Sequence, residues 1–106
     1  MASDKEYLAY VLDQLSGLGG VSHRAMMGEY VLYCRGRVVG GIYDDRLLVK
    51  DLPAARSLLP EAKTELPYEG GKPMLLVDPD DRELLEQVFD ALAEALPPPK
   101  DKRKKR

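Results

Sequence analysis

Apolar residues recur at helical spacing near both ends of the chain and are concentrated in strand-like runs between them. The spacing predicts a first helix over about residues 4–17, ended by glycines, and a short helix over about 52–59. A last helix is predicted after Asp78, which we expect to cap it, with Pro79 at its first position. Three consecutive prolines after Leu96 end this helix.

Three strands are predicted in the middle of the chain, where β-branched and aromatic residues are frequent. Their sequences are YVLYC, VVGGIY and RLLVK, separated by turns at 35–36 and 44–45. Two more short strands are predicted within LPYEGGKPMLLVD, on either side of its paired glycines. Short connections favour antiparallel pairing. We therefore expect an α+β two-layer sandwich, with a mainly antiparallel five-stranded sheet, helices on one face and the order α-β(3)-α-β(2)-α.

The predicted strands are apolar on both of their faces. In YVLYC, Tyr30, Leu32 and Cys34 point to one side, while Val31 and Tyr33 point to the other. Three helices can cover only one face of a five-stranded sheet, so the other face needs an explanation. A buried central strand, or a few aliphatic side chains at the surface of a monomer, is one explanation. Contact with another protein is the second, and we expect a homodimer or a protein partner on this uncovered face.

Composition is typical of one small globular domain. The 106 residues are 44% apolar and 32% charged, with room for one modest core. No apolar run approaches the roughly 20 residues of a membrane span, and the first residues do not resemble a signal peptide. A single cysteine fits a reducing compartment. We expect a cytoplasmic protein without membrane association, with a domain over 1–96 and a Pro-rich, then basic, disordered tail over 97–106.

The net charge of −2 conceals an uneven distribution. The final KDKRKKR has six basic residues and one acidic residue, so the other 99 residues have 10 basic and 17 acidic residues and a net charge of −7. A basic tail favours weak, non-specific contact with nucleic acid, whereas an acidic body opposes it. The tail has no aromatic residue to stack on bases, so a solvated terminus is the alternative. Its cations are Lys100, Lys102, Arg103, Lys104, Lys105 and Arg106.

His23 and Cys34 are the only histidine and the only cysteine, and they raise the question of a small Cys-His enzyme. A turn at 28–29 would place them opposite each other, where an imidazole can activate a thiol. A slip of one residue separates them, and a cysteine in an apolar run usually behaves as a small hydrophobe. One His and one Cys also fall short of a zinc ligand set, and no phosphate-binding glycine motif occurs. We expect no enzymatic activity, no catalytic residue, no metal and no cofactor.

The stretch HRAMMGEYVLYCRGRVVGGIYDDRLLVK resembles the TfoX N-terminal domain family, also known as the Sxy-type competence regulators. The resemblance rests on Arg24, Met26, Gly28, Tyr30, Tyr33, Gly36 and the strand that ends at Lys50. With PYEGGKPMLLVD and the last helix, it extends over about residues 4–96. It implies a secretion-chaperone-like fold, whose relatives often dimerise through their sheets, and a role in competence-gene transcription with a partner transcription factor. It implies no catalytic residues.

Two basic residues are the most informative candidates for binding. Arg24 and Lys50 either form a cationic spot on or near the sheet for an acidic partner or ligand, or they pair with Glu29 or Asp44 and fix the entry of a strand. We favour the structural role. The complete set of candidate interaction residues is Arg24, Met26, Gly28, Tyr30, Tyr33, Arg46 and Lys50. We expect a non-enzymatic regulatory or protein-interaction domain, with a weak nucleic-acid-associated factor that uses the tail as the alternative and a Cys-His enzyme as the third hypothesis.

Overall fold

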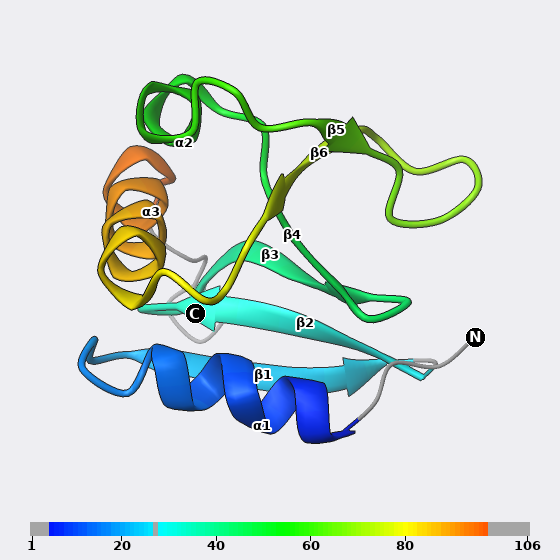
Figure 1. Cartoon of the computed structure of the whole chain (residues 1–106), viewed down its shortest axis with the longest axis horizontal. Coiled ribbons are helices and arrows are strands. Elements are labelled where there is room, and N and C mark those ends of the chain that lie inside the picture. The colour runs from blue at the N-terminus through cyan, green and yellow to red at the C-terminus, as the bar shows by residue number, and fades with distance from the viewer. Residues whose placement is uncertain (1–4, 27, 98–106) are drawn as a thin grey trace, which may run out of the picture.

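A six-stranded antiparallel sheet with three helices forms the part of the chain that the computed structural model describes, residues 5–26 and 28–97 (Figure 1). The elements are α1 (Lys5–Gln14), β1 (Val21–Met26), β2 (Glu29–Cys34), β3 (Arg37–Tyr43), β4 (Arg46–Val49), α2 (Pro53–Leu58), β5 (Thr64–Glu65), β6 (Met74–Val77) and α3 (Arg82–Ala95). The strands lie side by side in the order β1-β2-β3-β4-β6-β5, and every neighbouring pair is antiparallel. The predicted α+β class is confirmed.

The predicted strand number and element order are wrong, because four strands precede α2 and the order is α-β(4)-α-β(2)-α. The missed strand is β1, which pairs with β2 alone at the edge of the sheet. Five of its six residues are exposed. Both faces of β1 are exposed to solvent, so this edge strand does not need alternating apolar residues. The pattern that identifies buried strands is therefore missing from its sequence.

Both predicted hairpin turns are confirmed. Arg35 and Gly36 have φ values of 52° and 81°, and Asp44 and Asp45 have φ values of 54° and 57°. Two successive left-handed residues form a turn whose twist matches that of the flanking strands. Aspartate tolerates this conformation better than most residues do, because its short side chain can bond to nearby backbone groups.

The chain between the last two strands differs from the prediction. β5 lies before LPYEGG rather than within it, and residues 66–73 form a loop that leads to β6. In Figure 1 this loop extends at the upper right, away from the helices. Residues 66–73 therefore form a loop that packs over other residues, and they do not form a strand.

The last helix also begins later than predicted. The side chain of Asp81 accepts a hydrogen bond from the backbone N–H of Leu84 at 3.1 Å, so Asp81 is the cap and Arg82 is the first helical residue. Asp78 Oδ1 instead accepts the N–H of Asp80 at 2.9 Å. This local bond closes a turn around the buried Pro79, and the chain changes direction there before the helix starts.

All three helices contribute to one hydrophobic core on a single face of the sheet, as predicted. α2 and α3 lie side by side, at the left in Figure 1. The helices contribute Leu8, Val11, Ala55, Leu85, Val88, Phe89, Leu92 and Ala93, the turn after α1 contributes Leu15, and the sheet contributes Tyr30, Leu32, Cys34, Val39, Ile42, Leu47, Val49, Leu75 and Val77. Burial of these side chains provides the main driving force for folding.

The opposite side of the sheet, here called the second face, is partly covered by the chain itself. Val31 is 6% exposed and Leu48 is completely buried, although neither belongs to the core beneath the helices. Gly41 pairs with both of them and has no side chain. The ring of Tyr43 lies over Gly41, since a Cβ atom there would be 2.8 Å from Cε2 of Tyr43. The expectation of a fully uncovered second face is therefore wrong at Val31 and Leu48.

Candidate functional site

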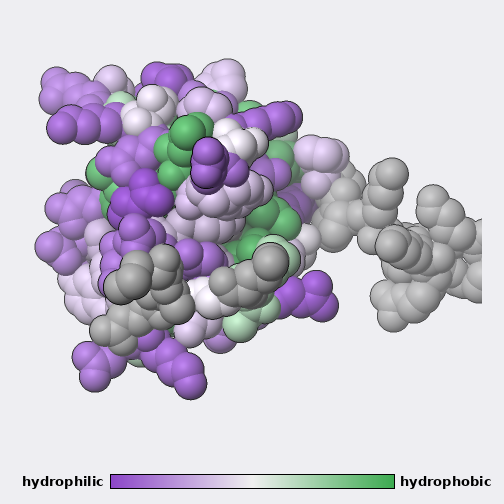
Figure 2. All heavy atoms as spheres, turned by 90° about the vertical axis from the view of Figure 1, so that its right-hand side faces the viewer, coloured by the Kyte–Doolittle hydropathy of each residue, from purple (hydrophilic) through white to green (hydrophobic). Residues whose placement is uncertain are grey.

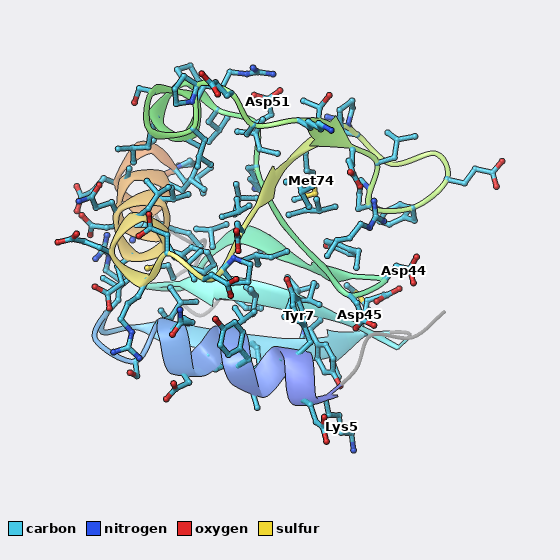
Figure 3. All side chains as sticks on the ribbon, viewed as in Figure 1. Lys5, Tyr7, Asp44, Asp45, Asp51 and Met74 are labelled. Carbon is cyan, nitrogen blue, oxygen red and sulfur yellow. The ribbon has the colours of Figure 1, made fainter. Side chains whose placement is uncertain are left out.

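A groove lies on the second face, between residues 66–73, here called the covering segment, and strands β3 and β4. Its volume is about 660 Å³. Pro67 of the covering segment is buried, and the Tyr68 ring meets the Tyr43 ring edge-on, with centroids 6.1 Å apart and planes at 61°. Met74 of β6 also lines the groove (Figure 3). The covering segment thus turns part of a sheet surface into a concave site.

Two lysines line this groove. The backbone N–H of Lys50 donates to the carbonyl of Val39 at 2.9 Å, which continues the pairing of β4 with β3 by one residue. Because Val49 points to the core, the Lys50 side chain lies on the second face. Lys72 comes from the covering segment. Among the described residues, neither lysine has an ion-pair partner, so both ammonium groups are available to an anion.

Asp51 is the one acidic residue lining the groove in the described part of the chain. Its carboxylate is engaged by Arg56, whose Nη2 donates to Oδ2 at 2.8 Å. The hydrogen bond from Arg56 lowers the pKa of Asp51, because it stabilises the ionised carboxylate. Asp51 is therefore balanced by its own cation, and the two lysines leave the groove with a positive charge.

Tyr43 connects the groove to the packing of the sheet. Burial raises the pKa of its phenol, and the neighbouring Tyr68, Glu29 and Tyr33 raise it further. The phenol of Tyr43 therefore stays neutral and able to donate a hydrogen bond at physiological pH.

The more open part of the second face lies over β1, β2 and the start of β3. It includes Arg24, Met26, Tyr33 and Val38, here called the open patch. Met26 is 50% exposed and Val38 is 37% exposed, while Tyr33 is half-buried and paired with Val38. Figure 2, which looks at the right-hand side of Figure 1, shows apolar residues at the surface of the molecule between hydrophilic ones.

Arg24 and Lys50, the two basic residues singled out from the sequence, lie apart on the sheet. Their strands β1 and β4 are separated by β2 and β3, which corresponds to about 14 Å at the usual spacing of strands. The two side chains therefore start from separate parts of the sheet. Glu29 Oε1 accepts the backbone N–H of Asp44 at 3.1 Å, so these two acidic residues are joined at the β3–β4 turn.

Three other predicted interaction residues have structural positions. Arg46 Nη1 lies 2.6 Å from Glu65 Oε1, and its Nε donates to the Tyr43 carbonyl at 3.1 Å, so it ties the β3–β4 turn to β5. Tyr30 is 8% exposed and faces the helices. Gly28 has φ 84° in the turn between β1 and β2. Of the three, Tyr30 is the one that this arrangement buries against the helices.

The geometry required for a Cys-His pair is absent. Cys34 is opposite Val21, and His23 is opposite Leu32, because the turn comes one residue earlier than the pairing requires. Cys34 is completely buried, and this burial raises the pKa of its thiol. Within 5–26 and 28–97, no group of three or more His, Cys, Asp or Glu side chains is arranged to hold a metal ion.

Of the groove lining, sequence reasoning identified Lys50 alone, and the polar and aromatic residues that it missed include Tyr43, Tyr68 and Lys72. The only signal for the last two was the segment YEGGKP, in which a tyrosine and a lysine flank two glycines. The predicted tail residues, from Lys100 to Arg106, lie outside the described residues. None of the helices in the described ranges has the length and apolar character that crossing a bilayer requires.

The fold and the second face define a small α+β domain with an antiparallel sheet, one layer of helices and a groove opposite to them. The chain belongs to the TfoX N-terminal domain family, whose sequence profile matches residues 13–95. A protein of Spirochaeta aurantia, described as an uncharacterized 12.7 kDa protein in the trpE 5' region, is 34% identical over 107 residues. The matched region covers 99% of this chain and 93% of that protein. No solved structure matches the chain significantly.

Proposed function

We propose that this chain is a non-enzymatic, cytoplasmic regulatory domain that acts through protein contacts and forms a homodimer through the open patch. The observation that carries the proposal is the exposure of Met26 and Val38 beside Tyr33, on the face that none of the helices within 5–26 and 28–97 covers. Membership of the TfoX N-terminal domain family supports a regulatory role in transcription or competence.

The occupant proposed for the open patch is a second copy of the chain. Apolar side chains at the centre of the patch provide the area that association needs to bury. Arg24 forms one side of the patch, and Glu29 and Asp44 lie at one of its ends, beside Met26. A two-fold axis through the patch would bring Arg24 of one copy towards the acidic end of the other. Such a contact would favour one orientation of the dimer.

The experiment is light scattering and sedimentation velocity at micromolar concentration. The proposal predicts a mass of about 24 kDa, twice the 11.8 kDa of one chain. Met26→Asp and Arg24→Glu should give monomers, because they place a charge in the apolar centre or reverse the complementary one. Leu66→Asp is the matched control, since Leu66 is 48% exposed but lies outside the open patch.

The wild-type chain, the two patch variants and the control should have the same far-UV circular dichroism, so that association is measured on folded protein. A monomeric wild-type chain throughout the micromolar range would overturn the proposed dimer. If the wild type, Met26→Asp and Arg24→Glu dimerise equally, the dimer contact lies on a surface other than the open patch.

A further inference from the structure

We infer that the groove beneath the covering segment binds a small organic anion that has a flat aromatic portion. This inference goes beyond the proposed dimer, because the two lysines and Tyr68 of the groove lie outside the open patch. Three features of the groove support it: its size, its charge and the exposed aromatic ring at its edge.

The size of the groove fits a small molecule. Its volume of about 660 Å³ lies within the range of roughly 300–1,000 Å³ that is usual for small-molecule sites. The lining is mainly apolar, with Pro67 and Met74 among its residues and Val38 at its border with the open patch, and it has a few polar groups. This combination buries a ligand's hydrophobic part while a few polar groups orient it.

The charge of the groove selects an anion. Lys50, directly after β4, and Lys72, in the covering segment, line the groove from two separate parts of the chain. The single opposing carboxylate, Asp51, is held by Arg56 through two hydrogen bonds. A carboxylate or phosphate in the groove would meet two ammonium groups without a competing internal anion. Tyr43 adds a neutral phenol to the same lining.

The aromatic preference comes from Tyr68. Its side chain is 63% exposed, although its ring contacts Tyr43 edge-on. An exposed ring face next to an apolar groove is a surface on which a flat ligand can stack, and aromatic pairs favour offset or edge-to-face contacts of this kind. Both charge and stacking are required, so a ligand with only one of them should bind weakly.

The inference is tested by ¹⁵N NMR titration of the full chain with four probes. AMP joins a ring to a phosphate, and 2-naphthoate joins a ring to a carboxylate, so these two probes distinguish the anionic groups. Adenosine has only the ring portion, and inorganic phosphate has only the charge. Saturable shifts at residues of β3, β4 and the covering segment are expected for AMP, 2-naphthoate or both, and little change is expected for adenosine and phosphate.

Variants connect binding to the groove. The double variant Lys50→Gln and Lys72→Gln should lower the affinity at least about tenfold, because both charge-assisted contacts are lost. Tyr68→Leu should also weaken binding. Lys63→Gln is the control, since Lys63 is an exposed lysine outside the groove lining. Met26→Asp should bind the probes as the wild type does, so that loss of the dimer is not confused with loss of the groove.

Several outcomes would overturn the inference. The absence of saturable shifts with both AMP and 2-naphthoate excludes a site for aromatic anions in the groove. Equal binding of adenosine contradicts the requirement for charge, and equal binding of inorganic phosphate contradicts the requirement for a ring. If the double lysine variant is folded, as judged by its NMR spectrum, and its affinity for the probes is unchanged, the probes bind outside the groove.

Discussion

At the scale of single residues, Gly41 controls how the second face packs. Its missing side chain leaves space between Val31 and Leu48, and the ring of Tyr43 occupies that space. Two aliphatic side chains are thereby buried on a face without helices. The apolar residues on the second face of β2 and β4 are thus explained in part by two residues of the strand between them, Gly41 and Tyr43 of β3.

Gly41→Ala is expected to destabilise the fold by about 1–3 kcal/mol, the usual cost of overpacking. The new methyl group would lie 2.5 Å from the Tyr30 carbonyl oxygen and 2.8 Å from the Tyr43 ring. The free energy of unfolding in urea measures the effect. Gly19→Ala is the control, because no atom lies within 4 Å of a Cβ at that position. Equal stability of the two variants would show that the Tyr43 ring and the backbone at Tyr30 both move away without cost.

Cys34 is expected to react slowly as long as the protein is folded. Burial raises its pKa, so less thiolate forms at any given pH and its pH profile of reactivity moves to higher pH. At pH 8, labelling by a disulfide reagent should be at least about 100-fold slower in the folded chain than in urea, where the thiol regains its ordinary pKa. Comparable rates in both conditions would contradict a buried thiol.

The same shift has a consequence for stability. The unfolded chain ionises its thiol at the ordinary pKa, while the folded chain still holds the proton. Folding stability should therefore fall as pH rises between the ordinary pKa and the raised pKa of Cys34. Cys34→Ala removes this dependence on pH, and comparison of the two urea-unfolding curves across that window measures it.

At the scale of elements, the features that depend only on residues close together in the sequence were predicted correctly. The turns at 35–36 and 44–45 and the apolar stripe of α3 depend on local pattern, and the structure has them. β1 depends on a partner strand, because its exposed residues give no strand signal of their own. The start of α3 was wrong because Asp78 and Asp81 are both suitable caps, and only the turn around Pro79 decides between them.

Asp81→Ala is expected to lower the free energy of unfolding by about 1 kcal/mol, the usual effect of losing a helix cap. Asp81→Asn should cost only a few tenths of a kcal/mol, because the amide oxygen can still accept the N–H of Leu84. Thermal or urea unfolding distinguishes the two variants. A loss in Asp81→Ala no greater than that in Asp81→Asn would indicate that Asp81 does not cap α3.

At the scale of the whole molecule, the groove was beyond the reach of sequence reasoning. Tyr68 meets Tyr43 across 25 positions of the chain, and Lys72 joins Lys50 in one lining only because the covering segment folds back over β3 and β4. Lys50 was identified from the sequence, but its neighbours were not. The positions of these side chains depend on tertiary packing, which the local sequence of a loop does not predict.

The basic tail gives a prediction that concerns the net charge of the entire chain. Without residues 100–106 the protein carries −7, so the truncated chain should show no salt-sensitive binding to duplex DNA. If about five tail cations contact phosphates in the full chain, its affinity should fall several hundred-fold between about 50 and 200 mM salt. Gel-shift or anisotropy measurements at the two salt concentrations test this. Equal DNA binding by both chains would exclude the tail as the binding element.

The ring of Tyr43 has two roles, because it fills the space above Gly41 and also borders the groove. Changes that suit a new ligand can accumulate at Tyr68 or Lys72 with little penalty, because these side chains are exposed. A change at Tyr43 alters the burial of Val31 and Leu48 at the same time. Within this lineage the groove is therefore free to diversify at its outer border, whereas its inner wall must evolve together with the stability of the sheet.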